Sequence, residues 1–239
     1  MTDPVELCAE ASAAWHASWL RALGLRSERG IDAWRALDRP PHIYLAGITL
    51  RADASADAVA DVPGGICDTW QTLDLTSLGF RVWRQEPWFH RPAGPLDHPV
   101  LRELEIVPVR TAPEVEEFEA VSVRGYENEE ATIEPGTFHP PAILEDPAMK
   151  MLVGRVEGRP VAAAMGYRTD SAVGVFGVTT VASARRRGYG AALTRAAMLT
   201  ETGLPSVLAP SEEGERVYER LGFRSVGALS IWVKASPDP

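Results

Sequence analysis

The sequence predicts an α/β protein with a mixed sheet flanked by helices and two unequal parts. Three observations predict this class. From residue 104 onward, strand-like runs alternate with helix-forming runs, an order typical of a mixed sheet covered by helices. A tract rich in proline and glycine, residues 91–99, separates this series from a less regular first part. Within the series, the β-branched run Val173–Val181 turns through two glycines into a helix-forming run at Ala191–Thr200.

We expect residues 1–98 to form a smaller α/β domain without a catalytic role, and residues 99–239 to form the catalytic domain. The first part begins with a helix over 5–23, because Leu7, Ala11, Trp15 and Trp19 recur at helical spacing before Gly24. Its other expected elements are strands at 42–50, 66–70, 80–84 and 88–91, and short helices at 53–62 and 73–78.

The second part has one clear order of elements. The expected strands lie at 104–110, 149–156, 161–168, 173–181, 206–209 and 223–233, with hairpin turns at 157–160 and 169–171. Helices are expected at 113–123, 190–203 and 214–221. This order fits a mixed sheet with helices on its faces.

Composition excludes several classes of partner. The formal net charge is −9, which argues against nucleic acid or an anionic membrane as a partner. No apolar run approaches the ~20 residues of a membrane span. Residues 1–10 contain acids where a signal peptide has basic and apolar regions, and Cys8 and Cys67 are expected as free thiols, so we expect a cytoplasmic protein. The five histidines show no ligand spacing, and no metal site is expected.

The turn Arg185-Arg186-Arg187-Gly188-Tyr189-Gly190 is the most informative stretch of the chain. A strand that turns through glycines into a helix exposes backbone N–H groups that bind an anion, and the helix dipole favours its charge. The arginines add fixed positive charge. The spacing fits neither a Walker loop, which needs a following lysine, nor a dinucleotide fingerprint with three glycines. A plain basic turn is the alternative.

A second motif, Tyr218-Glu219-Arg220-Leu221-Gly222-Phe223, follows at a suitable distance. Together the two motifs resemble the GCN5-related N-acetyltransferase (GNAT) superfamily over roughly residues 104–234. The resemblance implies that residues 185–190 and Ala191 hold the pyrophosphate of acetyl-CoA. It implies that backbone groups of Val178, Thr179 and Thr180 pair with the pantetheine arm. It also implies that Tyr218 protonates the departing thiolate, and Ser211 either caps the following helix through Oγ or contacts the pantetheine.

The group that deprotonates the acceptor amine is harder to identify. The strand 173–181 has no carboxylate or histidine where several relatives carry a glutamate. Candidates therefore come from the loop 126–143, which covers the acceptor cleft in the resembled fold. We select Glu130 as the base and Glu127, Glu129 and His139 as residues that contact the acceptor; a solvated acidic loop is the alternative for each.

A weak repeat links the two parts. Leu78-Gly79-Phe80-Arg81 echoes Leu221-Gly222-Phe223-Arg224 at an offset of 143 residues, and each is followed by a strand with tryptophan. The same offset maps Gly188 onto Leu45, where no arginine–glycine turn is found. The first part is thus a candidate for a shortened, coenzyme-free relative of the second, although this pattern is also a common helix ending.

We therefore expect an enzyme that moves an acetyl group from acetyl-CoA to a primary amine of a small molecule, without a metal. The excess of glutamates in the loop, over Glu127–Glu134, favours a cationic acceptor. Two further functions stay open: a coenzyme-binding sensor or scaffold without turnover, and an acyltransferase that uses a longer acyl group or acts on a protein amine. A homodimer is also open.

Overall fold

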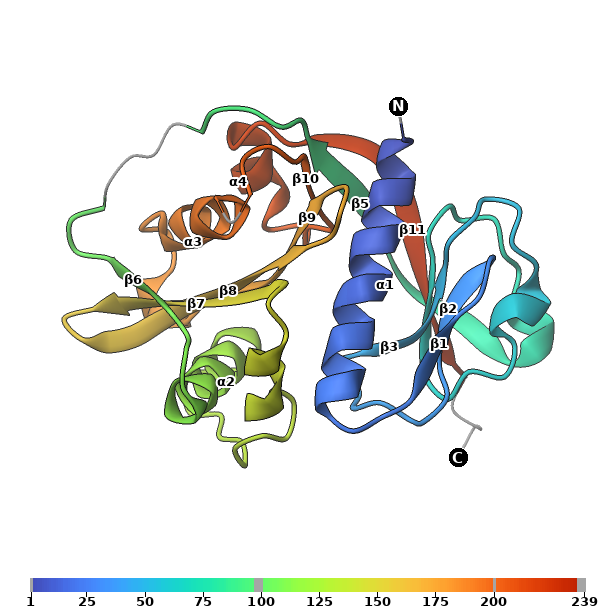
Figure 1. Ribbon diagram of the computed structural model, residues 1–239, viewed down its shortest axis with the longest axis horizontal. Helices are drawn as coiled ribbons and strands as arrows, with labels where there is room; N and C mark the ends of the chain where they lie inside the picture. The colour runs from blue at the N-terminus through green and yellow to red at the C-terminus, as the bar shows by residue number, and fades with distance from the viewer. Residues whose placement is uncertain (1, 97–100, 200, 236–239) are drawn as a thin grey trace.

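The computed structural model describes residues 2–96, 101–199 and 201–235. These residues form one sheet of eleven strands in the order β1-β2-β3-β4-β11-β5-β10-β9-β8-β7-β6 (Figure 1). The strands are β1 (Ser27–Arg29), β2 (Ala33–Ala36), β3 (Leu45–Thr49), β4 (Gly65–Asp68), β5 (Phe80–Arg91), β6 (Glu105–Pro108), β7 (Met149–Val156), β8 (Arg159–Arg168), β9 (Val173–Thr180), β10 (Ser206–Leu208) and β11 (Arg224–Lys234). The predicted α/β class, with a mixed sheet and flanking helices, is confirmed.

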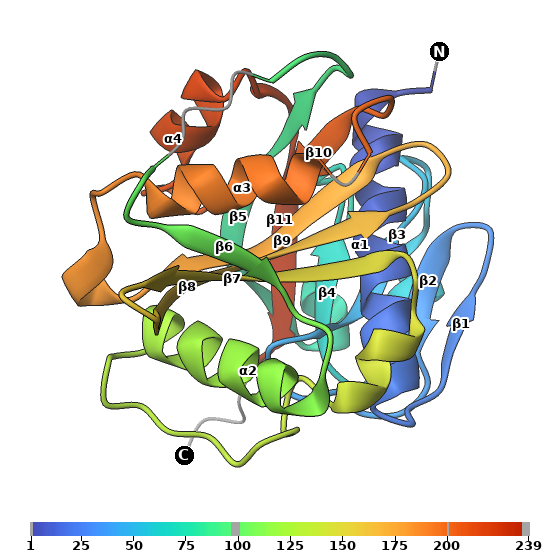
Figure 2. The same ribbon diagram turned by 60° about the vertical axis from the view of Figure 1, so that its left-hand side comes forward.

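Helices cover both faces of this sheet. They are α1 (Pro4–Ala22), α2 (Ala112–Tyr126), α3 (Tyr189–Met198) and α4 (Glu215–Arg220), with 3₁₀ turns η1 (Ala56–Val59), η2 (Thr76–Leu78), η3 (Pro141–Glu145) and η4 (Ala182–Ala184). Helices α2 and α3 lie on opposite faces of β7, β8 and β9 (Figure 2). None of the described helices combines the length and the apolar character that crossing a membrane requires.

The two parts of the chain repeat one topology. In the first part, β1, β2 and β3 form an antiparallel meander, and β3 pairs in parallel with β4. In the second part, β7, β8 and β9 form the same meander, and β9 pairs in parallel with β10. A long helix precedes each meander, α1 in one part and α2 in the other. The weak sequence repeat therefore coincides with a repeated strand order.

The two parts exchange their last strands. Strand β5 pairs with β10 of the second part, and β11 pairs with β4 of the first. The two exchanged strands also pair with each other, antiparallel, from Phe80 opposite Lys234 to His90 opposite Arg224. The expected domain boundary at residues 98 and 99 lies outside the described residues, and the division into a noncatalytic and a catalytic domain stays a prediction.

The structure corrects the register of the repeat. Residues 50–64 connect β3 to β4, but residues 181–205 connect β9 to β10. Because the first connection contains only the turn η1 and not a full helix, the offset of 143 residues does not hold before β4. The topological counterpart of the arginine turn is therefore the segment 50–64, not Leu45. That segment contains no Arg-x-x-Gly-x-Gly pattern.

Several expected elements differ in the structure. The short helices expected at 53–62 and 73–78 are only 3₁₀ turns, and the hairpin β1–β2 was not predicted. The two strands expected around Pro87 form the single strand β5, because β10 pairs only with Phe89–Arg91 and leaves one edge of β5 unpaired at the proline. The helix expected over 190–203 ends at Met198; Thr200 and residues 97–99 of the linker lie outside the described residues.

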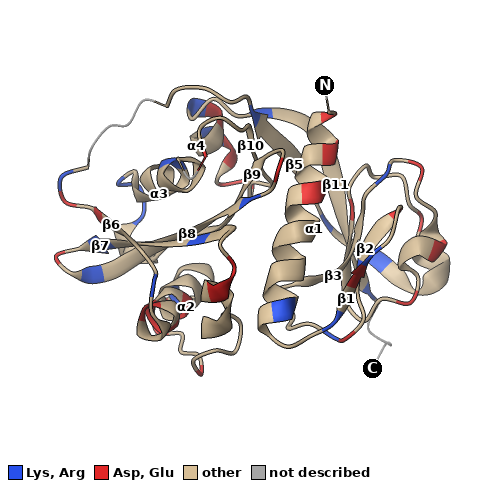
Figure 3. Cartoon of the chain, in the orientation of Figure 1, with Lys and Arg blue, Asp and Glu red and all other residues tan. Residues whose placement is uncertain are grey.

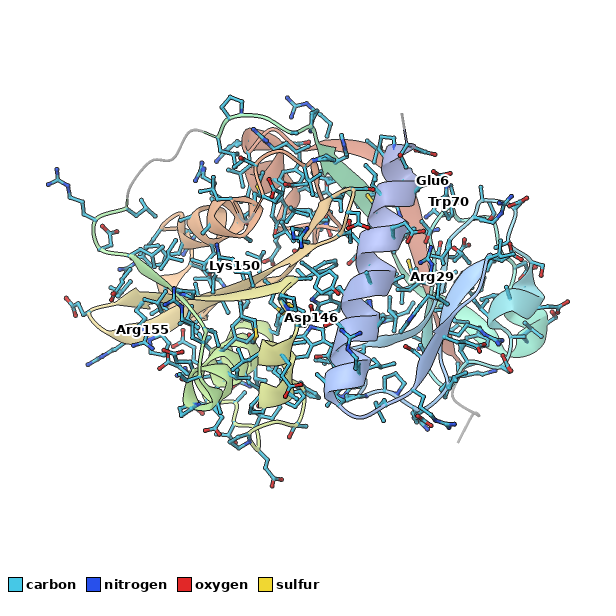
Figure 4. The ribbon with its side chains drawn as sticks, in the orientation of Figure 1. Glu6, Arg29, Trp70, Asp146, Lys150 and Arg155 are labelled. Atoms are coloured by element: carbon cyan, nitrogen blue, oxygen red, sulfur yellow. The ribbon has the colours of Figure 1, made fainter. Side chains whose placement is uncertain are left out.

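Helix α1 joins the two parts. Trp19 is fully buried, and Trp15 stacks on Phe176 of β9 with ring centroids 4.7 Å apart. Asp146, labelled in Figure 4 beside α1, accepts hydrogen bonds from Ser18 at 2.5 Å and from Arg21 at 2.9 Å. This contact fixes α1 against the segment that precedes β7. The thiols of Cys8 and Cys67 are free and buried.

Candidate active site

The parallel strands β9 and β10 separate soon after they meet. They pair at only two positions, Ser206 with Val173 and Val207 with Gly174. Beyond Gly174, β9 continues to Thr180 with β8 as its partner. An unpaired edge of a strand presents N–H and C=O groups that bind an extended partner. Beyond Gly174, the edge of β9 that faces β10 has no strand partner.

A bulge in β9 increases this separation. The pairing with β8 shifts by one residue between Ala163/Thr179 and Met165/Phe176. Gly177 lies in the bulge with φ +59°, a left-handed conformation that glycine adopts at little cost. Because a bulge bends its strand and increases the local twist, it directs the backbone of residues 178–180 away from the regular ladder. These three residues are the ones expected to pair with a pantetheine arm.

The arginine turn lies directly after this strand. Gly188 is the N-cap of α3 with φ +84°, and Arg186 has φ +64°. No side chain caps α3, so the first N–H groups of the helix stay available to an anion. A Cβ added at Gly190 would meet Thr180 and Val178 only at ordinary contact distances of 3.7 and 3.8 Å. The strand, turn and helix thus have the geometry of an anion site.

The residues of the turn have different partners. Arg185 donates to the carbonyl oxygens of Thr180 at 3.0 Å and Gly125 at 2.8 Å, so it ties the end of α2 to β9. Arg186 and Arg187 are exposed at the rim. Tyr189 is buried, and its phenol donates to Glu103 at 3.4 Å. Ala191 lies in the first turn of α3. The basic and acidic positions are interspersed over the chain (Figure 3).

Tyr218 lies in α4, which follows β10. Its ring packs edge-on against Phe223 with centroids 6.0 Å apart, and its phenol forms a hydrogen bond with Thr194 of α3. Burial raises the pKa of Tyr218 to about 12, while the bond to Thr194 acts in the opposite direction. The phenol therefore keeps its proton at neutral pH. The carbonyl oxygen of Ser211 accepts a hydrogen bond from the N–H of Gly214 at 2.8 Å. The N-cap residue of α4 is Gly214 and no side chain caps the helix, so the Oγ cap, one of the two alternatives for Ser211, does not form.

The acidic loop has several separate roles. Glu129 accepts a hydrogen bond from the backbone N–H of Ser183 in η4, and this bond lowers its pKa. Glu127 and Glu130 are exposed. His139 is buried edge-on against Trp19 and Phe118, in the core beside α1. The structure therefore does not bring His139 together with the exposed glutamates of the loop.

Buried Glu119 organises the end of that loop. Its carboxylate accepts hydrogen bonds from the backbone N–H groups of Gly136 at 2.6 Å, Phe138 at 2.6 Å and His139 at 2.9 Å. A buried carboxylate is tolerated when its lone pairs are satisfied in this way. Glu119 is thus a structural anchor from α2, and its four-residue spacing from Val115 and Val123 marks it as part of the inner face.

Three further residues of α2 and β5 were not singled out from the sequence. They are Tyr126 at the end of α2, and Arg84 and Glu86 of β5. Tyr126 is 64% exposed. The alternation Arg84-x-Glu86 is a weak sequence signal, because only the strand exchange places β5 beside β10.

An acidic depression of about 480 Å³ lies over β5, β11 and α4. Its lining residues include three glutamates and two glutamines and no lysine or arginine: Gln71, Gln85, Glu86, Pro87, Phe89, Glu215, Glu219, Ser225, Gly227 and Ala228. A concave surface of this charge favours a cationic ligand. The described residues bring together no group of three or more histidine, cysteine, aspartate or glutamate side chains that could hold a metal ion.

Comparisons with known proteins give one family-model match and several similar folds. Residues 113–223 match the sequence model of the Acetyltransferase (GNAT) family. Among solved structures, the chain is similar to a GCN5-related N-acetyltransferase from Kribbella flavida, with 20% identity, a TM-score of 0.64, and coverage of 95% of this chain and 96% of that one. A comparison with curated proteins finds no match.

Two further structures share the fold. A protein assigned to the GNAT family from Novosphingobium aromaticivorans DSM 12444 has 21% identity and a TM-score of 0.60, over 95% of this chain and 99% of that one. A conserved protein of unknown function from Staphylococcus epidermidis ATCC 12228 has 13% identity and a TM-score of 0.59, over 87% and 93%. At these identities the likeness establishes the fold, and it extends over both parts of the chain.

Proposed function

Since residues 113–223 of this chain form an acetyltransferase domain of the GNAT superfamily, we propose that the protein transfers an acetyl group from acetyl-CoA to a primary amine of a small molecule. The observation that carries this proposal is the opening between β9 and β10, with the uncapped N-terminus of α3 at its end. An extended pantetheine arm fits the free edge of β9, and a pyrophosphate fits the helix N-terminus.

Tyr218 is placed to supply the proton that the departing thiolate needs. Its phenol is protonated at neutral pH and contacts α3, the helix that begins at the anion site. The same burial that raises the pKa of Tyr218 also raises the pKa of a thiolate formed beside it, so the two groups stay matched for proton transfer. Attack of a neutral amine on the thioester carbonyl then forms the C–N bond and breaks the C–S bond.

The acidic depression supports an amine as the acceptor. Glu215 and Glu219 flank Tyr218 in α4, and Glu86 faces them from β5. An ammonium group is attracted to a recess that contains only acidic and neutral side chains. The same field raises the pKa of the bound amine, so the transfer needs a base and should become faster as pH rises.

Calorimetry with acetyl-CoA tests the coenzyme site. Gly190→Asp places a carboxylate at the expected pyrophosphate position and should weaken binding at least tenfold, about 1.4 kcal/mol. Gly190→Asn is the matched control, because it has the same size without the charge and should lose less affinity. Equal affinity in the wild type and both folded variants would contradict the assignment.

A turnover assay tests the transfer itself. The release of free coenzyme A thiol is measured with acetyl-CoA and putrescine, spermidine, benzylamine or hydroxylamine as probe amines. Amine-dependent release in the wild type supports the proposal. A protein that binds acetyl-CoA but releases no thiol with any amine is a coenzyme-binding sensor or scaffold. Faster release with longer acyl chains would indicate a different acyl donor, and faster release with a lysine-containing peptide would indicate a protein acceptor.

A further inference from the structure

Besides the acid Tyr218, the proposed reaction needs a general base for the acceptor amine. An alkylamine with a pKa near 10 is protonated at neutral pH, so a base must remove a proton before the nitrogen can attack. Strand β9 has no ionisable side chain between Val173 and Thr180. The base must therefore come from another element of the described active site.

Glu86 of β5 has the environment of a base. Its side chain is 16% exposed and lies 3.2 Å from the guanidinium of Arg84. Burial raises the pKa of Glu86, and Arg84 partly offsets this effect. A carboxylate with a moderately raised pKa is still ionised at neutral pH but holds a proton more firmly, which makes it a better base.

The surroundings of Glu86 connect it to Tyr218. Glu86 lines the acidic depression with Glu215 and Glu219, which flank Tyr218 in α4. From α2, the phenol of Tyr126 interacts electrostatically with both Glu86 and Tyr218. In β4, burial raises the pKa of the Cys67 thiol, and the charge of Glu86 adds to this effect. The depression therefore places Glu86 of β5 opposite α4, the helix that carries the expected acid.

We propose that Glu86 is the general base of the acetyl transfer, on the premise of the proposed function. Its carboxylate takes one proton from the acceptor ammonium and passes it to solvent. The neutral amine attacks the thioester carbonyl, the C–N bond forms, and the C–S bond breaks. Tyr218 gives its proton to the thiolate and recovers one from the nitrogen of the product. The net reaction converts ammonium and acetyl-CoA into amide, free thiol and one proton.

This assignment gives the first part of the chain a direct role in the reaction. Glu86 lies before the linker, within the part expected to be noncatalytic, and reaches the recess only because β5 lies between β10 and β11. It also offers a different base from Glu130, which is exposed on the loop after α2. The two glutamates can be separated by experiment.

The test uses Glu86→Gln in the full-length protein, with Glu86→Asp as the conservative variant. Glu117→Gln is the matched control, since Glu117 is also a half-buried glutamate paired with an arginine, Arg155, at 2.7 Å. Turnover is measured with putrescine, spermidine and benzylamine, and with hydroxylamine, which is largely unprotonated at neutral pH and needs no base. Binding of acetyl-CoA to each variant is measured by calorimetry.

We expect Glu86→Gln to lower kcat/KM for alkylamines by about 10²-fold or more, within the range for general bases, with acetyl-CoA affinity unchanged. Turnover of hydroxylamine should change little, Glu86→Asp should recover part of the loss, and Glu117→Gln should match the wild type. The acidic limb of the alkylamine pH profile should disappear in Glu86→Gln. In Arg84→Gln that limb should move to higher pH, because loss of the cation raises the pKa of Glu86.

Four outcomes overturn the assignment. If the wild type is active and Glu86→Gln has the same alkylamine pH profile, Glu86 is not the base, and the proposed function stays intact. If Glu86→Gln loses turnover of hydroxylamine and of alkylamines equally, Glu86 supports the structure of the site and is not the base. If the wild type acetylates hydroxylamine but no alkylamine, the protein contains no working base. Wild type without turnover of any amine refutes the proposed function itself, and Glu86 with it.

Discussion

Two buried histidines should make the stability of this protein fall steeply below neutral pH. His139 is 5% exposed between the rings of Trp19 and Phe118, and burial lowers its pKa to about 3. Its Nδ1 lies 3.9 Å from Glu119, but that carboxylate already accepts three backbone hydrogen bonds, so desolvation dominates. His16 is also 5% exposed, and burial lowers its pKa to about 4 although Nδ1 lies 2.8 Å from the carbonyl oxygen of Ser12.

The size of the effect follows from proton linkage. An unfolded histidine has a pKa near 6.5, so between pH 6.5 and about 4 the unfolded chain binds protons that the folded chain excludes. The folded state therefore loses stability as pH falls through this window and levels off beneath it. From pH 7 to pH 5 each histidine contributes a loss of about 2 kcal/mol in the free energy of unfolding, and the two together about 4 kcal/mol.

Urea unfolding of the wild type and of His139→Phe at pH 7 and pH 5 measures this effect. The variant keeps an aromatic ring between Trp19 and Phe118 and removes one titrating group. We expect the wild type to lose about 4 kcal/mol on acidification and His139→Phe to lose about 2 kcal/mol. If both proteins lose the same amount, His139 is solvated or protonated in the folded state, and the core position described above is wrong.

Three further variants test the contacts around the site. Gly125→Ala should weaken acetyl-CoA binding and destabilise the protein by about 1–3 kcal/mol, because the added Cβ would meet Oγ1 of Thr179 at 2.1 Å. Unchanged acetyl-CoA affinity in calorimetry and unchanged urea unfolding would contradict this close packing of α2 on β9. Tyr218→Phe should keep acetyl-CoA affinity and lose about 10² in kcat, and normal turnover would mean that water protonates the thiolate. Asp146→Asn should cost about 1–3 kcal/mol in urea unfolding, because Ser18 and Arg21 lose a charged acceptor, and an unchanged midpoint would show that α1 docks through its apolar face alone.

The sequence determined those parts of the site that are local. The turn 185–190 could be predicted because a strand, a pair of glycines and a helix follow each other within a few residues, and the backbone conformation at Gly188 depends mainly on that local order. The helix that carries Tyr218 was predicted for the same reason, from the helical run that ends at Leu221 and Gly222. The α/β class followed from the alternation of strands and helices.

The tertiary structure alone decided where β5 lies. Its pairing partners are Ser206–Leu208 on one edge and Arg224–Lys234 on the other, more than a hundred residues away along the chain. Such pairing depends on long-range register and on which edges of the sheet are free, and neither leaves a pattern in a short window of sequence. The position of Glu86 opposite α4 therefore could not be read from the chain, although the arginine turn and Tyr218 could. Local chain order determines the arginine turn and the helix of Tyr218. Only the assembly of the eleven-stranded sheet determines where Glu86 lies.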